Sequence, residues 1–326
     1  MMALMKRWVV ALGLGVMLWP VHAARANERG WEYLIDKLIA DGVEYGRVVA
    51  AFRDRRVRPF DGLEFSVNPP HEPRGMYRRF TRPASVAAAR RCRARYAAAF
   101  ESAERAYGVP ASVLASILYV ETGCGQNTGS QVILYRLARL AMANEPENLQ
   151  RNLERVADEH GRLDPATALR VRARAQYLEN TFYPEVRALF VVAERTRVSP
   201  LDIHGSGSGA FGYPQFLPTS YLKYGIDADG DGRVSLYDTG DAAASCARYF
   251  VGHGWHAELS TAQRRAAVWQ YNHSDAYVDT VLTLAARLGG APAVTRVSAK
   301  QSAKHAPPKQ RRHRSTRKTP VQEARR

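Results

Sequence analysis

The sequence predicts a mainly α-helical protein with a minor irregular or β part, and three observations support this class. Apolar residues recur at a spacing near 3.6 in most segments between residues 31 and 271, which is the period of an amphipathic helix. Strand-like patterns are sparse, and the best candidate is Arg58 to Val67. The 326 residues, 46% hydrophobic and 24% charged, are enough for one large globular domain or two smaller ones, and they contain no internal repeat.

The predicted helices follow one another along the chain, and glycine and proline mark several of their ends. Pro83 to Tyr107 is expected to form one long helix that Gly108-Val109-Pro110 ends. Ala111 to Glu121 is apolar on most sides and is expected to lie in the core. The other predicted helices are Trp31 to Ala40 and the residues after Asp41, Val132 to Ala143, Glu147 to His160, Pro165 to Leu178, Pro184 to Arg195, Asp241 to His253 and Ala262 to Tyr271.

The N-terminus has the pattern of an export signal. Lys6 and Arg7 precede an apolar run from Trp8 to Trp19, and two candidate cleavage sites with small residues follow. The run is shorter than the roughly 20 residues that cross a bilayer, and no cysteine after it could carry a lipid. We therefore expect residues 1–26 to be a signal peptide of an exported protein that is not a lipoprotein; the alternative is an uncleaved membrane anchor.

The formal net charge of +16 lies mostly outside the expected domain. The segment 291–326 has eleven Lys or Arg residues, one acidic residue and no aromatic residue, so it carries +10 and is predicted to be a disordered basic tail. Lys6 and Arg7 before the apolar run carry another +2, which leaves about +4 for the rest of the chain. Nucleic-acid binding is therefore the weakest interpretation. The tail is either simply solvated or a tether to anionic envelope surfaces.

Glu121 stands at the end of the apolar helix, before a Gly-Cys-Gly turn. Burial and the negative end of the helix dipole both disfavour a charged carboxylate there and would raise its pKa toward that of a general acid. The alternative is a glutamate at a helix end that reaches solvent.

Residues 206–221 form a glycine-rich block in which Ser206 and Gln215 are the polar groups available to a ligand. It is not a phosphate loop, because no Gly-Lys-Ser/Thr follows, and it lacks the context of a dinucleotide-binding fingerprint. A second polar and aromatic block runs from Trp269 to Tyr277 and contains Tyr271, Asn272 and Tyr277. Aromatic faces and amides suit sugar rings, although a capped helix junction with buried tyrosines explains this block equally well.

Residues 227–238 have the pattern of a calcium loop. Asp227, Asp229 and Asp231 occupy positions 1, 3 and 5, and a glycine occupies position 6. Position 12 is Asp238 where such loops have glutamate, and Asp241 follows three residues later. The pattern favours Ca²⁺ over an empty acidic turn but leaves the closing ligand open.

Taken together, these blocks resemble the B-type lytic murein transglycosylase family. The matching motifs occur in the family's order over roughly Trp31 to Leu288: Val120-Glu121-Thr122 with Gly125-x-Asn127-Thr128-Gly129, Gly209 to Tyr221, the Asp-Gly-Asp-Gly loop, His253-Gly254-Trp255, and Tyr271-Asn272-x-Ser274-Asp275-Ala276-Tyr277. The resemblance implies a periplasmic enzyme with a lysozyme-like core, about residues 83–285, inside a domain of residues 27–290. It implies cleavage of peptidoglycan between N-acetylmuramic acid and N-acetylglucosamine, with release of 1,6-anhydro-muramic ends.

The same resemblance implies roles for single residues. Glu121 matches the family's catalytic acid/base, and Ser206 and Gln215 match positions near it. Tyr271 and Asn272 match the pair that faces the scissile sugar, and Tyr277 matches another aromatic of the cleft.

For the metal, the resemblance implies Asp227, Asp229, Asp231, the Arg233 carbonyl and Asp241 as calcium ligands. The sequence departs from the family at Gly207, where a tryptophan is common, and at Cys124, where an aromatic residue is usual.

A single catalytic carboxylate fits a lytic rather than a hydrolytic reaction. Hydrolysis of a glycoside normally uses two carboxylates, and the Asp cluster of residues 227–241 is expected to serve a metal. One glutamate suffices if the C6 hydroxyl of the substrate is the nucleophile. The alternatives are a hydrolytic muramidase and a non-catalytic peptidoglycan-binding protein. Other cell-wall enzymes are conceivable partners, and no organic cofactor is expected.

The three cysteines suggest one structural disulfide. Cys92 and Cys124 lie at similar distances from the turn at Gly108, so an antiparallel helix hairpin would bring them to the same level. We therefore predict a Cys92–Cys124 disulfide and a buried free thiol at Cys246. Three reduced cysteines in the core are the alternative.

Overall fold

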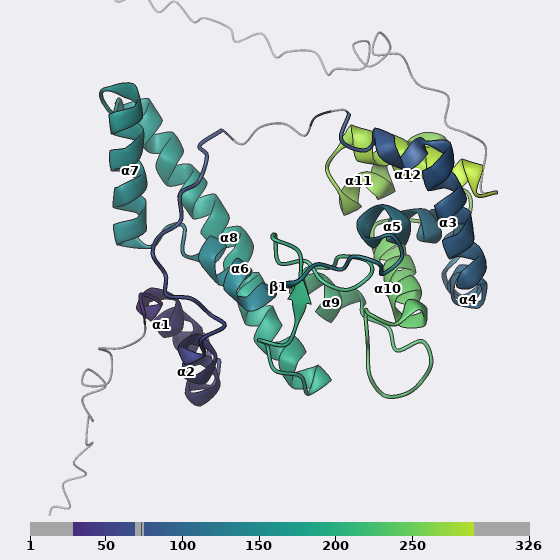
Figure 1. The fold of residues 1–326 in the computed structure, drawn as a ribbon, viewed down its shortest axis with the longest axis horizontal. Coiled ribbons are helices and arrows are strands. Elements are labelled where there is room, and N and C mark those ends of the chain that lie inside the picture. The colour runs from purple at the N-terminus through teal and green to yellow at the C-terminus, as the bar shows by residue number, and fades with distance from the viewer. Residues whose placement is uncertain (1–28, 69–72, 74, 290–326) are drawn as a thin grey trace, which may run out of the picture.

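The computed structural model describes residues 29–68, 73 and 75–289 (Figure 1). The expected signal peptide and the expected basic tail lie outside these residues. Both therefore stay predictions, as does the domain boundary at residue 290.

The described residues are mainly helical, as the sequence predicts, and contain one very small antiparallel sheet (Figure 1). The α-helices are α1 (Glu32–Ala40), α2 (Tyr45–Arg53), α3 (Pro83–Arg95), α4 (Ala97–Tyr107), α5 (Ala111–Thr122), α6 (Ile133–Ala141), α7 (Pro146–His160), α8 (Pro165–Thr196), α9 (Pro218–Tyr224), α10 (Thr239–Gly252), α11 (Thr261–Tyr271) and α12 (Asp275–Arg287). A short 3₁₀ helix, η2 (Arg78–Thr81), precedes α3. The strands are β1 (Gln131–Val132) and β2 (His204–Gly205).

Side-chain caps explain where several helices begin. The carboxylates of Glu44, Asp164 and Asp238 accept backbone N–H groups of the first turns of α2, α8 and α10. Ser260 and Gln263 form a capping box at the start of α11, and Ser274 caps α12. These local signals fix where α11 and α12 begin.

The helices form two groups with separate apolar cores. The first lobe contains α3, α4, α5, α10, α11 and α12, and the second contains α1, α2, α6 and α9 with the C-terminal half of α8 (Figure 1). A third, smaller core lies between α7 and the N-terminal half of α8. Tyr271 packs against the cores of both lobes. The strands pair Gln131 with Gly205 and Val132 with His204, which holds the residues after Glu121 next to the glycine-rich block.

The single helix predicted over Pro83 to Tyr107 is wrong. The chain leaves helical geometry at Tyr96 (φ −112°, ψ 29°) and forms α3 and α4. The two helices have different neighbours: α3 contacts η2 and α5, whereas α4 packs mainly on α10. Tertiary packing therefore sets a break that an Ala- and Arg-rich sequence does not signal.

The two helices predicted on either side of residues 179–183 are one helix, α8, with Pro184 inside it. A proline within a helix costs about 3 kcal/mol relative to alanine. Tyr183, Val186 and Leu189 are buried in the second lobe around this position, and their burial at about 1.5–3 kcal/mol each offsets that cost.

The strand predicted at Arg58 to Val67 is also wrong, because its backbone groups bond to side chains instead of a neighbouring strand. The Asn148 carboxamide accepts the Leu63 N–H at 2.7 Å, and Asn152 accepts the Phe65 N–H and donates to the Leu63 carbonyl. These asparagines are four residues apart on α7, so they form a ladder along one face of the helix.

Five elements were not predicted: the 3₁₀ helix η2, the α-helices α9 and α12, and the strands β1 and β2. Strand β1 takes Val132 from the predicted helix 132–143. Pro218 at the first turn of α9 and Ser274 before α12 are start signals that could have revealed both helices.

Among the described residues, no helix combines the length and the hydropathy that crossing a membrane requires.

We expect Asn152→Ala to lower the free energy of unfolding by about 2–3 kcal/mol, because it leaves the Phe65 N–H and the Leu63 carbonyl without partners. Urea denaturation followed by circular dichroism measures the change. Gln150→Ala, at an exposed position of the same helix, is the control and should change stability by less than about 0.5 kcal/mol. Equal losses in the two variants would contradict the ladder.

Candidate active site

Glu121 lies in the last turn of α5, a helix that is buried on nearly all sides. Gly123 adopts the left-handed conformation (φ 61°) and ends the helix directly after it. The Glu121 side chain is half-buried, and its Oε1 accepts a hydrogen bond from the Tyr277 hydroxyl at 2.5 Å. The structure therefore holds this carboxylate at the edge of a core by a buried donor from α12.

Two parallel tyrosine rings lie beside the carboxylate. The rings of Tyr271 and Tyr277 are 6.4 Å apart and inclined by only 4°. Burial, followed by the Glu121 carboxylate, raises the pKa of Tyr277 well above its ordinary value. Burial also raises the pKa of Tyr271, with smaller contributions from Cys246 and Glu121. Both hydroxyls therefore stay protonated, and thus able to donate, throughout the pH range in which a carboxyl group titrates.

Asn272 and Tyr77 lie next to this pair of rings, and the sequence did not single out Tyr77. The Asn272 amide donates to the Tyr77 hydroxyl at 3.3 Å, and the Tyr77 ring meets that of Tyr277 edge-on at 5.5 Å. Tyr77 comes from the irregular segment before η2, where no periodic pattern marks it, so only the folded structure reveals its place.

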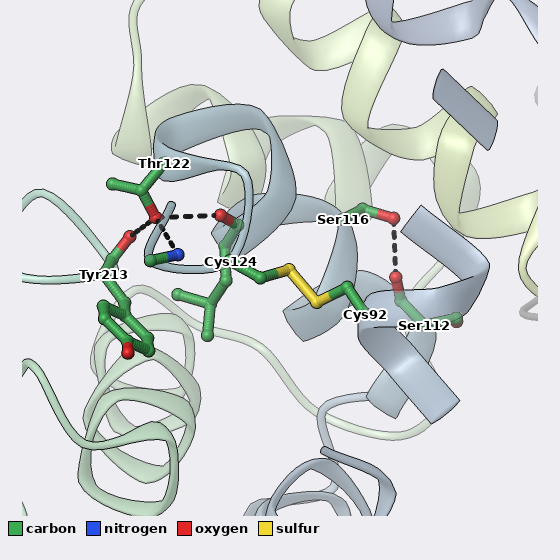
Figure 2. Close-up of a disulfide and its surroundings, with 8 residues drawn as sticks. Cys92, Ser112, Ser116, Thr122, Cys124 and Tyr213 are labelled. Atoms are coloured by element: carbon green, nitrogen blue, oxygen red, sulfur yellow. Dashed lines mark hydrogen bonds between the residues drawn. A yellow bond between two sulfur atoms is a disulfide. The ribbon is translucent and has the colours of Figure 1, made fainter. Parts of the chain in front are cut away.

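The turn after Glu121 depends on small residues and on Thr122. The Thr122 hydroxyl accepts the Gly125 N–H at 3.0 Å and donates to the Tyr213 carbonyl at 3.0 Å (Figure 2). Gly125 has φ 85°, and a Cβ there would overlap the Tyr213 ring. Because only glycine fits this position, the Gly125 motif is a steric requirement of the turn.

The structure brings Gln215 and Ser206 to this region, and both side chains also hold the loops together. The Gln215 amide donates to the carbonyls of Thr128 at 3.1 Å and Gly212 at 2.9 Å, from a left-handed backbone with φ 51°. The Ser206 hydroxyl accepts the Ala210 N–H at 3.2 Å. Gln215 thus connects the turn after Glu121 with the glycine-rich block.

A pocket of about 380 Å³ shares Gln215 and Tyr271 with the residues around Glu121. Its other lining residues come from α8, from the segment 208–220 and from α10 and α11: Phe182, Ser208, Ala210, Phe216, Leu217, Ser220, Tyr249 and Gln270. Aromatic rings mixed with a few hydroxyls and amides are typical of a wall that binds sugars. The sequence did not predict Phe182, Tyr249 or Gln270 as members of the site.

The acidic loop brings three of the predicted metal ligands together. Carboxylate oxygens of Asp227, Asp229 and Asp241 lie within 4.8 Å of one another. Asp241 is buried, and its burial, followed by nearby carboxylates, raises its pKa above the ordinary value. Carboxylates grouped at this distance repel one another when they are all ionised. Carboxylate oxygens are also the ligands that a hard cation such as Ca²⁺ prefers.

Three other residues of the loop have different contacts. Asp238 caps α10 by accepting the N–H groups of Gly240 and Asp241. Its carboxylate is therefore not one of the three that lie together. Asp231 accepts the Arg233 N–H at 2.8 Å, and the structure does not place its carboxylate with the other three. Asp241, and not Asp238, thus lies with Asp227 and Asp229.

A disulfide joins Cys92 of α3 to Cys124, three residues after Glu121 (Figure 2). The two Cα atoms are 6.3 Å apart, and Cys246 is a buried free cysteine. Both findings agree with the expectation from the sequence, although α3 and α4 are not one continuous helix. The bond attaches the turn that follows Glu121 to a helix of the first lobe.

Comparison with known proteins gives a consistent result. The family model described as "Transglycosylase SLT domain" matches residues 27–268. Over 194 residues, 58% of this chain, the sequence is 33% identical to membrane-bound lytic murein transglycosylase B of Escherichia coli (strain K12). The match covers 45% of that protein, so the chain spans less than half the length of this curated relative.

Two solved structures are similar in fold. Escherichia coli lytic transglycosylase Slt35 in complex with calcium matches with a TM-score of 0.59 and 23% identity, covering 81% of this chain and 94% of that chain. Pseudomonas aeruginosa SltB3 in complex with NAG-anhNAM-pentapeptide matches with a TM-score of 0.58 and 19% identity, covering 81% and 79%. The mainly α, lysozyme-like fold that the resemblance implied is therefore confirmed.

We expect Cys92→Ala combined with Cys124→Ala to lower the free energy of unfolding by about 3–4 kcal/mol, because the bond closes a loop between residues 32 apart in sequence. Thermal unfolding measures the loss as a drop of several degrees in Tm. Dithiothreitol should lower the Tm of the wild type toward that of the variant and leave the variant unchanged. Equal Tm values without reductant would refute a stabilising disulfide.

Proposed function

Because the chain belongs to the SLT transglycosylase family, we propose that it is a lytic transglycosylase of peptidoglycan. It cleaves the β-1,4 bond between N-acetylmuramic acid and N-acetylglucosamine and leaves 1,6-anhydro-muramic ends. The observation that carries this proposal is the Glu121 carboxylate, fixed by the Tyr277 hydroxyl at the end of a buried helix.

Glu121 acts first as an acid and then as a base. In its protonated form it donates to the glycosidic oxygen, so that the bond to C1 of the muramic acid breaks and the N-acetylglucosamine leaves with a hydroxyl group. The carboxylate then accepts the proton of the C6 hydroxyl, whose oxygen forms the new bond to C1. No water is consumed, and Glu121 regains its proton.

The surroundings of Glu121 support a one-carboxylate reaction. The acidic residues of α12, Asp275 and Asp279, pair with Arg265. Asp227, Asp229 and Asp241 of the 227–241 loop group with one another instead. Tyr271 and Tyr277 remain neutral, so they orient groups without serving as a second base. Asn272, Gln215 and Ser206 provide polar groups to position the sugar.

The proposed glycan path runs past Glu121 into the pocket of Gln215 and Tyr271. A ligand bound to the SltB3 relative, named NAG-anhNAM-pentapeptide, has the anhydro group that this reaction would produce. That likeness supports the same substrate class for this chain.

We propose that Asp227, Asp229 and Asp241 bind Ca²⁺, with Asp231 and the Arg233 carbonyl as further ligands of the loop. The grouped oxygens and the calcium complex of the E. coli relative support this assignment. A bound cation would relieve the repulsion among the carboxylates and stabilise the loop between α9 and α10.

We also propose that the protein acts in the periplasm, exported by residues 1–26, with residues 27–290 as the transglycosylase domain. Peptidoglycan is the partner that the site implies, and the tail 291–326 would contact anionic envelope surfaces without specific nucleic-acid binding. The match to a membrane-bound murein enzyme supports an envelope location.

Glu121→Gln should reduce the cleavage of purified sacculi by at least about 10³-fold, because the amide can neither donate nor accept the transferred proton. Glu101→Gln, the same change at an exposed position of α4, is the control and should leave the rate unchanged. Mass spectrometry of the wild-type products should show ends lighter by one water than hydrolysed ends. Products with that water would indicate a muramidase, and undiminished lysis by Glu121→Gln would indicate a binding protein.

Calcium should raise the Tm of the wild type, since a ligand at about 100 times its Kd stabilises the folded state by about 2.7 kcal/mol. Asp241→Asn should abolish this calcium-dependent rise. Asp238→Asn should keep it, although the loss of part of the α10 cap lowers the starting Tm. A wild-type Tm that does not change with calcium would contradict the proposed calcium site. Loss of the calcium-dependent rise in Tm in Asp238→Asn but not in Asp241→Asn would contradict the choice of Asp241 as a ligand.

A further inference from the structure

Residues 75–100 contain seven arginines and no acidic residue. Two of them, Arg90 and Arg93, donate to the carbonyls of Arg287 and Leu288 at the end of α12. The other five are exposed, and we call them the basic wall: Arg78, Arg79, Arg82, Arg91 and Arg95. Within the ranges that the structure describes, no ion pair includes any of the seven.

The basic wall is attached to the active site at its η2 end. Tyr77, next to Arg78, touches Asn272 and Tyr277, and Tyr277 holds Glu121. The Phe80 ring meets Tyr119 of α5 edge-on at 6.1 Å. The Arg79 guanidinium lies 4.7 Å from the centre of the Phe80 ring. Because Phe80 packs against Tyr119, this ring also connects Arg79 to α5.

The α3 end of the basic wall is attached covalently. Cys92, between Arg91 and Arg95, is bonded to Cys124, three residues after Glu121. The disulfide therefore ties α3, the helix that carries Arg91 and Arg95, to the turn that follows Glu121 (Figure 2).

Among the residues that the structure describes, the acids of the neighbouring helix α12 pair with another arginine. Helix α12 packs against η2, and its acidic residues Asp275 and Asp279 pair with Arg265 of α11. An anionic group that approaches this side of the site thus meets several arginines that form no ion pair with any described carboxylate.

We propose that the basic wall binds the carboxylates of the peptides attached to muramic acid, so that the enzyme prefers peptide-bearing glycan strands. The inference rests on the proposed function, because it requires a muramic acid at Glu121. An extended pentapeptide spans about 17 Å at about 3.3–3.6 Å per residue, which lets its acidic groups reach arginines around the site. Guanidinium–carboxylate contacts are charge-assisted, and at an exposed surface they weaken as salt rises.

An anionic lipid surface would also attract exposed arginines. The peptide is the favoured ligand because an aromatic contact and a disulfide fix both ends of the wall to residues around Glu121. A membrane contact needs no such connection to the reacting sugar.

The test compares kcat/KM on soluble glycan strands with peptides and on the same strands after amidase removal of the peptides. At low salt the wild type should prefer peptide-bearing strands by about tenfold, and 0.5 M NaCl should reduce this ratio toward one. The double variants Arg78→Gln/Arg79→Gln and Arg91→Gln/Arg95→Gln should each lower the ratio at least threefold. Glutamine keeps the helix propensity of α3 close to that of arginine, so the fold should persist.

The control is the double variant Arg162→Gln/Arg172→Gln, which removes two exposed arginines. These arginines lie where α7 is followed by α8, at the end of the long axis opposite to α3 (Figure 1). This control should keep the wild-type ratio, and an equal fall would mean a non-specific effect of charge and overturn the inference. A wild-type ratio of one would overturn it as well. The inference would also be overturned if the basic-wall variants kept the wild-type ratio of kcat/KM but lost binding to phosphatidylglycerol vesicles. The basic wall would then be a surface that binds lipids. If the wild type cleaves neither kind of strand, the proposed function itself fails.

Discussion

The arrangement of the site depends on one contact, the hydrogen bond from the buried Tyr277 hydroxyl to the Glu121 carboxylate. A carboxylate at a helix C-terminus faces the negative end of the dipole, so the helix itself gives it no support. The donor comes from α12, and α12 packs along α5 in the same apolar core. The first lobe thereby fixes the acid, while Gln215 and the β1–β2 pair connect the following turn to the glycine-rich block. Tyr271 packs against the cores of both lobes and also lines the pocket.

Features that depend on local stereochemistry could be predicted from the sequence. The end of α5 at Gly123 and the turn at Gly125 follow from left-handed backbone positions, and the grouping of the Asp227 and Asp229 carboxylates follows from their spacing in the loop. Features decided by tertiary packing could not be predicted in this way. The break at Tyr96, the intact helix through Pro184 and the place of Tyr77 at the site depend on neighbours that are distant in sequence.

The acidic loop shows how the structure narrows alternatives that the sequence leaves open. Asp238 and Asp241 are both near the position of the closing ligand, and both are carboxylates. Asp238 accepts N–H groups at the start of α10, which is the ordinary role of an N-cap. One turn later, Asp241 is buried and accepts the Ala228 and Ser235 N–H groups from the loop itself. The two acids therefore have different structural roles: Asp238 caps the helix, and Asp241 binds the backbone of the loop.

The net charge of the chain is a poor guide to its electrostatics. Most of the +16 belongs to the two ends, and the body carries about +4, which alone indicates no anionic ligand. The distribution within the body is uneven, however, because seven arginines and no acids occupy residues 75–100. Aromatic contacts and a disulfide hold this segment next to α5 and to the turn that follows it, so the charge lies on the Glu121 side of the molecule. An anionic group reaching the site would experience the local field of these arginines. If the proposed preference for peptide-bearing strands holds, this local field, rather than the net charge of the chain, is its physical cause.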